Sequence, residues 1–336
     1  MAAAALRAGL IGCGFFGRIQ AEAWRRLDGV QLVAACDPLL ERAQSLASRA
    51  YPTAEEMIER ERLDFLDIAA GPESHLPLVR LAAAHGLPVI CQKPMAPSWA
   101  EALAMVQAAE AAGVRLIIHE NWRWQPWFRA AKSHIERGDI GRPLAYLFRV
   151  RRNDGRPPAP YPHQPYFRRM PRLLIYETLV HQVDTARFLF GDPAAVYAQA
   201  RRLNPQIAGE DQALLVLTHP GGLPGVIDGH RYLDLAPDSP LMGEAIFEGE
   251  QGALRISPEG DLWLDGRCLW RNQIRQGYRG DSVFAAQQHF LNCLARGAPC
   301  ESEARRYLTT FGAVEAAYRS LAEGRAVRLE EILPCE

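Results

Sequence analysis

Short apolar runs alternate with longer segments of helical periodicity over the first third of the chain. The periodicity predicts β-strands at 7–12, 30–36, 64–70, 88–91 and 114–119, and helices at 16–27, 39–50, 73–85 and 97–112. Gly86 and Gly113 follow two of these helices, where a left-handed residue commonly ends a helix. This alternation predicts an α/β domain with a parallel, doubly wound sheet. Its ligands are expected beyond the carboxyl ends of the strands.

The pattern changes after residue 122. A helix is predicted at 127–137, a strand at 144–152, a proline-rich loop at 153–172 and a helix at 176–190. Further strands are predicted at 194–201, 212–218, 225–232, 244–249 and 253–256, followed by helices at 281–296 and 303–323. Short turns between the strands indicate a mostly antiparallel open sheet. We therefore expect two domains, an α/β domain over 1–122 and an α+β domain over 123–336.

Composition narrows the class of protein. The chain has 336 residues, of which 48% are hydrophobic and 23% charged, as in ordinary globular proteins. The net charge of -1 provides no field that would recruit nucleic acid or an anionic membrane. The seven cysteines are scattered and include no C-x-x-C pair, which indicates reduced thiols. With no signal peptide or apolar span in the pattern, we expect a cytoplasmic protein that acts on a small molecule.

A glycine-rich motif stands between the first predicted strand and helix. Residues 12–17 read Gly12-Cys13-Gly14-Phe15-Phe16-Gly17, and Asp37 follows 20 residues after Gly17, at the end of the second strand. In this context the glycines permit a tight turn, the helix N-terminus attracts a pyrophosphate, and the carboxylate accepts hydrogen bonds from a ribose. The motif predicts a bound dinucleotide. A glycine-rich turn without a ligand is the structural alternative.

The residue at position 37 also bears on the choice of cofactor. A carboxylate repels a ribose 2′-phosphate, and the next two residues, Pro38 and Leu39, supply no cation. NAD is therefore expected rather than NADP, although Arg42 is near enough in sequence to accept a phosphate.

Polar and aromatic side chains mark a substrate site beyond the sheet. Asn121, Arg123 and Trp124 stand at the predicted domain junction, where tryptophan faces stack on sugars and amides bind hydroxyls. The long loop carries Tyr161, His163 and Tyr166, which are candidate substrate contacts or simply exposed side chains.

Several short stretches in this order resemble the Gfo/Idh/MocA oxidoreductase family, over nearly the whole chain. They are Gly71-Pro72-Glu73-Ser74-His75, Gln92-Lys93-Pro94, Asn121-Trp122-Arg123-Trp124-Gln125-Pro126, Glu177-Thr178-Leu179-Val180-His181-Gln182-Val183-Asp184 and Glu315-Ala316-Ala317-Tyr318-Arg319-Ser320. The chain departs from the family pattern at Gln92, where a glutamate is usual, and at Glu177, where an aspartate is usual. The departures put the tuning of the neighbouring pKa values and the substrate fit in question.

The resemblance implies a nicotinamide-dependent dehydrogenase that oxidises a sugar or polyol, at an aldose C1 or a ring alcohol. It implies that the first domain is a Rossmann domain that binds the nicotinamide cofactor. It also implies that the second domain binds the substrate and forms a homodimer or homotetramer through its sheet. The catalytic set would be Lys93, His181 and Glu177, with Asp184 holding substrate or His181. The cofactor contacts would be Gly12, Gly14, Phe15, Phe16, Gly17, Asp37, Pro72, His75, Gln92 and Lys93.

The residue types suit this chemistry. Oxidation of an alcohol needs a base for the hydroxyl proton, which His181 can supply near neutral pH, and a cation such as Lys93 to stabilise the developing alkoxide. On a helix Glu177 and Asp184 would share one face with His181. We expect no metal. A divalent-metal site on Glu177, His181 and Asp184, a core role for His181 and a solvated Lys93 remain alternatives.

Other functions stay open at this point. Some relatives of the family use NAD transiently to cleave glycosides without net redox change, and a non-catalytic NAD-binding regulator is a third possibility. The run His119-Glu120-Asn121-Trp122-Arg123-Trp124-Gln125 resembles the branch of the family that contains the D-apiose dehydrogenases.

Overall fold

The computed structural model describes residues 5–236 and 238–333, which form two compact units. The first unit runs to Asn121 and also contains Asp281–Leu308; the second comprises Trp122–Gly280 and the chain from Thr309 onward. The boundary after residue 121 lies next to the predicted one. Segment Asp281–Leu308, expected in the second domain, packs with the first unit instead, because its helix supplies apolar side chains to the core of the parallel sheet.

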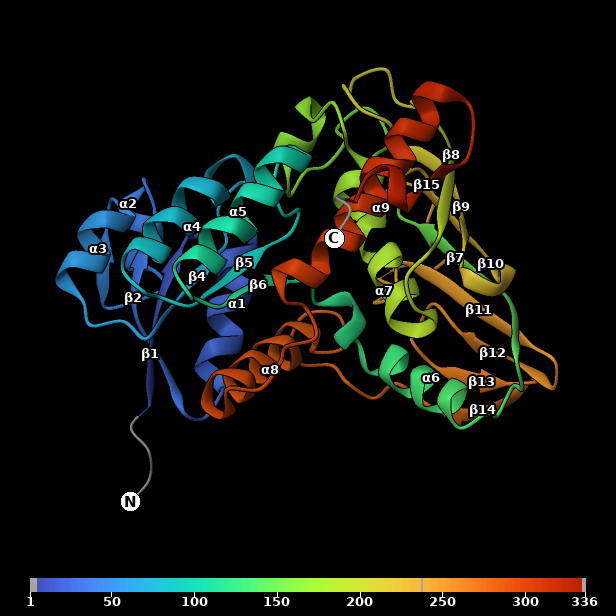
Figure 1. The fold of residues 1–336 in the computed structure, drawn as a ribbon, viewed down its shortest axis with the longest axis horizontal. Helices are drawn as coiled ribbons and strands as arrows, with labels where there is room; N and C mark the ends of the chain where they lie inside the picture. Colours follow the sequence, from blue (N-terminus) through green and yellow to red (C-terminus); the bar gives the residue numbers. More distant parts are fainter. Residues whose placement is uncertain (1–4, 237, 334–336) are drawn as a thin grey trace. The chain divides into compact units, whose positions relative to one another are not determined.

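The first unit is built on a six-stranded parallel sheet in the order β3-β2-β1-β4-β5-β6 (Figure 1). The strands are β1 (Leu6–Ile11), β2 (Val30–Cys36), β3 (Arg49–Tyr51), β4 (Phe65–Ile68), β5 (Val89–Gln92) and β6 (Leu116–His119). The helices are α1 (Phe15–Arg26), α2 (Leu40–Gln44), α3 (Ala54–Arg60), α4 (His75–Ala84), α5 (Trp99–Ala111) and α8 (Ser282–Arg296). The strand order is that of a dinucleotide-binding Rossmann fold, so the predicted fold class is confirmed.

The prediction was wrong over 39–50. Instead of one long helix the chain forms the short α2 and then β3, which pairs with β2 from Ala34 opposite Arg49 to Cys36 opposite Tyr51. Helix α3 follows and was not predicted. The local pattern is helical, but parallel pairing with β2 supplies backbone hydrogen bonds that the pattern does not reveal.

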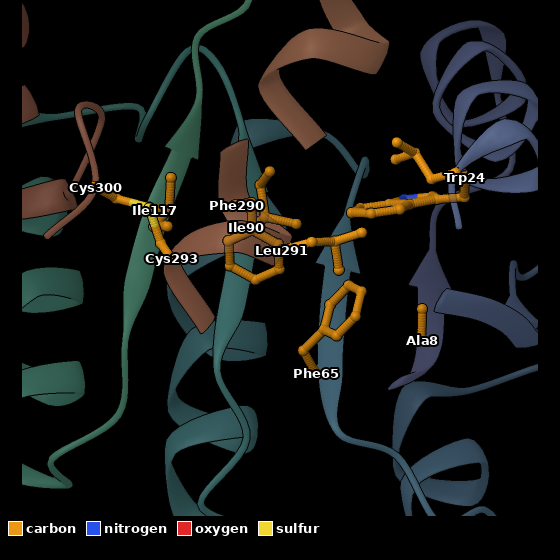
Figure 2. Close-up of a cluster of buried hydrophobic side chains, with 10 residues drawn as sticks. Ala8, Trp24, Phe65, Ile90, Ile117, Phe290, Leu291, Cys293 and Cys300 are labelled. Carbon is orange, nitrogen blue, oxygen red and sulfur yellow. The ribbon is translucent and has the colours of Figure 1, made fainter. Parts of the chain in front are cut away.

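Helix α8 completes the core of this unit (Figure 2). Phe290 lies edge-on to Phe65, with ring centroids 5.0 Å apart, and Trp24 packs against Phe65 at 5.2 Å. All three side chains are almost fully buried. Truncation of a buried aromatic of this kind costs about 3–5 kcal/mol, so a segment distant in sequence is part of the stability of the nucleotide-binding unit.

The second unit holds a nine-stranded sheet in the order β14-β13-β12-β11-β7-β10-β9-β8-β15. Its strands are β7 (Pro143–Arg151), β8 (Ala195–Arg201), β9 (Gln212–Thr218), β10 (Pro224–His230), β11 (Gly243–Gly249), β12 (Gly252–Ile256), β13 (Leu262–Leu264), β14 (Arg267–Trp270) and β15 (Val327–Arg328). Among the described strands of this sheet only β7 and β10 pair in parallel, which confirms the mostly antiparallel sheet. The last three strands are too short to stand out in the sequence.

Helices cover one face of this sheet. They are α6 (Pro126–Glu136), α7 (Val180–Phe190) and the part of α9 (Ala304–Glu323) from Thr309 onward, and Figure 1 shows them along the same side. A π-helical segment, Leu174–Leu179, leads directly into α7. Such segments are rare and occur most often at functional sites. Among the described residues, no helix combines the length and apolarity that a membrane crossing requires.

Candidate active site

The glycine loop forms a tight turn between β1 and α1. A Cβ on Gly12 would lie 2.7 Å from the backbone of Ala69, and one on Gly17 would lie 2.0 Å from the carbonyl oxygen of Gly12. A Cβ on Gly14 would meet nothing within 4 Å. The first and third glycines are thus required for packing. The second leaves open space at the helix N-terminus, where no side chain caps α1 and no acidic residue lies in its first turn. This end of α1 suits a pyrophosphate.

Asp37 ties the second strand to this loop. One carboxylate oxygen accepts a hydrogen bond from the Cys13 amide at 2.8 Å, and the other accepts one from the Leu39 amide at 2.9 Å. The side chain is only 6% exposed. Both hydrogen bonds fix the carboxylate, and each oxygen retains capacity for a second donor such as a ribose hydroxyl. The geometry is the one expected for binding an adenosine ribose.

Two polar side chains at the ends of β5 and β6 provide a test of the fit to a dinucleotide. Gln92 and His119 are register partners on these neighbouring strands, and both are buried. The Gln92 side-chain oxygen accepts from the Lys93 amide at 2.7 Å. Within residues 5–236 and 238–333, however, nothing pairs with Gln92 Nε2 or with either ring nitrogen of His119. Burial lowers the pKa of His119 to about 4, so the neutral ring offers one donor and one acceptor.

Buried polar atoms of this kind are costly unless a ligand satisfies them. Those of Gln92 and His119 lie at the carboxyl edge of the sheet, where a doubly wound fold binds its cofactor. Ribose hydroxyls or a carboxamide would supply the missing partners. The residues present therefore fit a nicotinamide dinucleotide. Sequence reasoning missed His119, although its place at the end of the sixth strand was a usable signal.

His75 has a different place from the one predicted. It was expected to reach the cofactor, but its ring is fully buried, with Nδ1 3.0 Å from the Met95 carbonyl and Nε2 3.0 Å from the Ala70 carbonyl. Burial lowers the pKa of this ring, and a neutral imidazole donates to only one of the two carbonyls. His75 thus connects the loops that follow β4 and β5. Pro72, also a predicted cofactor contact, begins the half-buried turn just before it.

Lys93 and the two phenylalanines lie at the same edge of this sheet. Lys93 is half-buried directly after β5 and precedes a cis peptide bond to Pro94. Phe15 is 46% exposed. Phe16 lies edge-on to the His119 ring, with the ring centroids 6.3 Å apart. The first unit thus brings together the glycine loop, Asp37, Gln92 and Lys93 on loops that follow parallel strands.

The π-helical segment of the second unit holds Glu177 close to a buried arginine. Glu177 accepts a hydrogen bond from the Thr178 hydroxyl at 2.8 Å and lies 4.0 Å from Arg231. Arg231 donates to Thr178 at 2.7 Å and forms a bidentate ion pair with Asp154. Glu177 therefore lies beside an arginine whose closer carboxylate partner is Asp154. Arg231 reaches this segment from the loop after β10 and was not predicted as a site residue.

His181 lies in the first turn of α7 and stacks on Trp122. The ring centroids are 4.5 Å apart and the planes are inclined by 18°. The imidazole is only 6% exposed. This packing restricts the ring to one orientation.

Asp184 pairs with an arginine inside the second unit. Its fully buried carboxylate forms a bidentate ion pair with Arg123, at 2.6 and 2.7 Å, and accepts a hydrogen bond from Thr310 at 2.9 Å. Both Arg123 and Asp184 were predicted to contact substrate, yet they neutralise each other inside the second unit. Loss of either partner would leave an uncompensated buried charge.

The other predicted substrate contacts are dispersed. Asn121 donates to Ser282 at 2.7 Å in the first unit, while Trp124 has Arg129 over its ring at 4.4 Å in the second. Tyr161 is 2% exposed and packs on Phe167, and therefore belongs to a small core cluster under the proline-rich loop.

His163 is exposed on the same loop, and so is Tyr166, whose side chain is 52% exposed and whose hydroxyl accepts a hydrogen bond from Gln164. The loop therefore presents two of its three predicted contacts to solvent and buries the third.

Comparison with known proteins agrees with this geometry. A family model described as "Oxidoreductase family, NAD-binding Rossmann fold" matches residues 6–120, and the model of the GFO/IDH/MocA C-terminal domain matches residues 128–255. The two matches cover the parallel sheet and much of the second sheet.

Full-length relatives carry the comparison further. The chain is 37% identical to a D-apiose dehydrogenase of Paraburkholderia graminis, over 96% of this chain and 89% of the relative. It is 35% identical to a D-apiose dehydrogenase of Rhizobium rhizogenes, over 98% and 99%. A crystal structure of an oxidoreductase from Agrobacterium radiobacter, in complex with NAD+, L-tartaric acid and magnesium, is 34% identical with a TM-score of 0.90, over 98% and 99%. The chain belongs to the Gfo/Idh/MocA family of NAD-binding oxidoreductases.

Proposed function

We propose that this protein is an NAD-dependent dehydrogenase that oxidises a cyclic sugar at its anomeric carbon, with D-apiose as the first candidate substrate. The choice of substrate is supported by the similarity to two D-apiose dehydrogenases over 96% and 98% of the chain. Inositol dehydrogenases also match, at 27% identity for the Thermotoga maritima protein, so a ring alcohol is the second substrate class to test.

The choice of NAD rests on Asp37. Two backbone amides hold its carboxylate at the end of β2, and its negative charge would oppose a ribose 2′-phosphate. The neighbouring Arg42 is exposed and could offset that charge only by moving toward the phosphate. The glycine loop, Gln92 and His119 would hold the rest of the cofactor through main-chain and side-chain hydrogen bonds.

The proposed oxidation removes a hydride from carbon and a proton from the hydroxyl group. Bound NAD+ would supply the acceptor for the hydride that leaves the carbon carrying the hydroxyl. In the proposal His181 accepts the hydroxyl proton, and Glu177 stabilises the imidazolium that forms. Lys93 stabilises the negative charge that develops on the oxygen. Oxidation at C1 of a cyclic aldose then yields a lactone, NADH and one proton.

The open face of the second sheet supports a role in assembly. Five half-buried apolar side chains lie in register across adjacent strands: Ile246 on β11, Leu147 on β7, Val226 on β10, Val216 on β9 and Tyr197 on β8. A continuous apolar row on a sheet face is typical of a subunit interface. We infer a homodimer or homotetramer formed through this face.

The test is formation of reduced nicotinamide by the purified full-length protein with NAD+ or NADP+. D-apiose, other aldoses and myo-inositol are compared as substrates. Lys93→Met and His181→Asn are each expected to lower kcat by about 10²–10⁴-fold. The matched controls are Lys132→Met and His85→Asn; Lys132 lies on α6 and His85 is exposed at the end of α4.

The outcomes separate the candidate functions. Turnover of one sugar with NAD+, lost in both variants and kept in both controls, supports the proposal. Turnover that survives in His181→Asn would remove the assigned base. Absence of net NADH formation, together with release of sugar from a glycoside, would contradict dehydrogenation and favour the hydrolase.

A further inference from the structure

Three side chains with soft donor atoms meet where α8 ends. His289 and Cys293 are one helical turn apart on α8, and Cys300 follows on the loop toward α9. One ligand atom of each lies within 4.8 Å of the other two. Figure 2 shows the sulfurs of Cys293 and Cys300 next to each other beside β6. This is the one group of at least three histidine, cysteine or carboxylate side chains in 5–236 and 238–333 with metal-ligand spacing.

One pair in this group has the spacing of two ligands on a tetrahedral ion. Zn²⁺ binds imidazole nitrogen at about 2.0–2.1 Å and thiolate sulfur at about 2.3 Å, so two such ligands lie about 3.6 Å apart at a tetrahedral angle. His289 Nε2 and Cys293 Sγ are 3.4 Å apart. The pair therefore already has the separation that a shared ion requires.

The hydrogen bonds around the imidazole identify its donor atom. The amide of Glu301 donates to His289 Nε2 at 3.0 Å, so this nitrogen carries a lone pair and no proton. An ion would take this lone pair in place of the amide hydrogen. It would also replace the thiol protons of both cysteines, which leave to water. Two thiolates and a neutral imidazole then balance a divalent charge in a site where both cysteines are buried.

We propose that His289, Cys293 and Cys300 form a structural site for a soft divalent ion such as Zn²⁺, with water as fourth ligand. The site would connect the end of α8 to the loop that covers β6, the edge strand of the parallel sheet. That loop already follows the edge: the Ile118 amide donates to the Ser302 carbonyl at 2.9 Å, and Ile117 forms a bridge with Glu303. A fixed loop here protects an otherwise open sheet edge.

The experiment uses tag-free, full-length protein that has been reduced and freed of metal with a chelator. Co²⁺ is the probe, because thiolate ligands give a sulfur-to-cobalt charge-transfer band and tetrahedral geometry gives strong visible bands. One equivalent is expected to bind, and Zn²⁺ is expected to displace it. Added Zn²⁺ should also raise the unfolding temperature, since an ion that binds only the folded state stabilises it.

Variants locate the ion. Cys293→Ser and Cys300→Ser are expected to lose most of the charge-transfer band, and His289→Gln to weaken binding about a hundredfold or more. Cys268→Ser, which changes a half-buried cysteine on β14 in the other unit, is the matched control and should bind as the parent does. The proposal is overturned if the reduced parent shows no charge-transfer band, or if the band persists in both cluster variants. A Cys293–Cys300 disulfide in unreduced protein, with no band after reduction, would identify a redox pair instead.

Discussion

The indole of Trp122 lies flat against the imidazole of His181, 4.5 Å away between ring centroids. Trp122 comes from the short turn before α6 and His181 from the first turn of α7, so two separate segments of the second unit fix the orientation of one ring. A base that must receive a proton from a substrate hydroxyl benefits from such a restriction, because reaction rates depend steeply on alignment.

We expect Trp122→Leu to lower kcat by about ten- to a hundredfold, and Trp122→Phe to restore most of the loss. A leucine removes the flat surface that orients His181, whereas a phenylalanine keeps it. Thermal unfolding is measured in parallel, because Trp122 is also almost fully buried. A fall in stability with unchanged kcat would show that the stacking serves the core and not the reaction.

The unpaired atoms of Gln92 and His119 give a prediction about cofactor binding. Gln92→Met and His119→Leu keep the approximate volume and remove the polar atoms. Each is expected to weaken NAD+ binding by about tenfold, the effect of one lost hydrogen bond of average to high strength. Binding is measured by calorimetry without substrate. Unchanged affinity in both variants, with the fold intact, would place these side chains outside the cofactor site.

The carboxylate of Asp37 is expected to determine the preference for NAD+ over NADP+. In Asp37→Ala the ribose loses its acceptor and the 2′-phosphate loses its repulsion, so NAD+ affinity should fall about ten- to a hundredfold while NADP+ affinity rises. Glu41→Ala, which removes an exposed carboxylate on α2, is the control and should change neither. Equal losses for both cofactors would mean that Asp37 mainly holds the Cys13 amide and the glycine loop.

Local motifs carried most of what could be predicted. The roles of the glycine loop and Asp37 could be predicted because their conformations depend mainly on residues near them in the sequence. Lys93 stands beside a proline at a strand end, and His181 stands in a helical pattern, so both could be assigned to their elements. The two-sheet architecture followed from periodicity alone.

Long-range pairing explains the rest. Arg231 reaches Glu177 and Thr178 from the loop after β10, and Arg123 pairs with Asp184 although they are far apart in the chain. The sequence presents each of these charged residues as a candidate ligand, because nothing in it indicates which charge has an internal partner. The packing of α8 against Trp24 and Phe65 could not be predicted either, because α8 has an ordinary amphipathic pattern that does not indicate its partner.

Asp67 predicts a pH dependence of stability. It is fully buried, accepts hydrogen bonds from Gln20 and Trp24, and burial raises its pKa from 3.8 to about 7. Between these values the folded state binds the proton more tightly than the unfolded state does. The free energy of unfolding should therefore fall as pH rises from about 4 to about 7, and this contribution is constant at higher pH.

The check is denaturant unfolding of the parent and of Asp67→Asn across that range. Buried histidines such as His75 and His119 have lowered pKa values and contribute the opposite slope, so the difference between parent and variant is the relevant quantity. That difference should change with pH only between about 4 and about 7. Asp28→Asn, an exposed carboxylate, serves as control. A pH-independent difference would show that Asp67 ionises normally.

The apolar row across the second sheet predicts the oligomeric state. Leu147 lies within the row, opposite Val226 on one neighbouring strand and Ile246 on the other. We expect the parent to be a dimer or tetramer by light scattering at micromolar concentration. Leu147→Glu combined with Val226→Glu should shift it to monomer, because burying two carboxylates in an interface costs far more than the apolar contact they replace.

Leu144→Glu is the matched control for this experiment. Leu144 is also on β7 and is 45% exposed, but it lies at the register shift between β7 and β11 and is not a member of the apolar row. The control should assemble as the parent does. A monomeric parent, or a double variant that still assembles, would contradict an interface through this face. Circular dichroism of the double variant separates a loss of assembly from a loss of fold, since the row lies on the face away from the buried core.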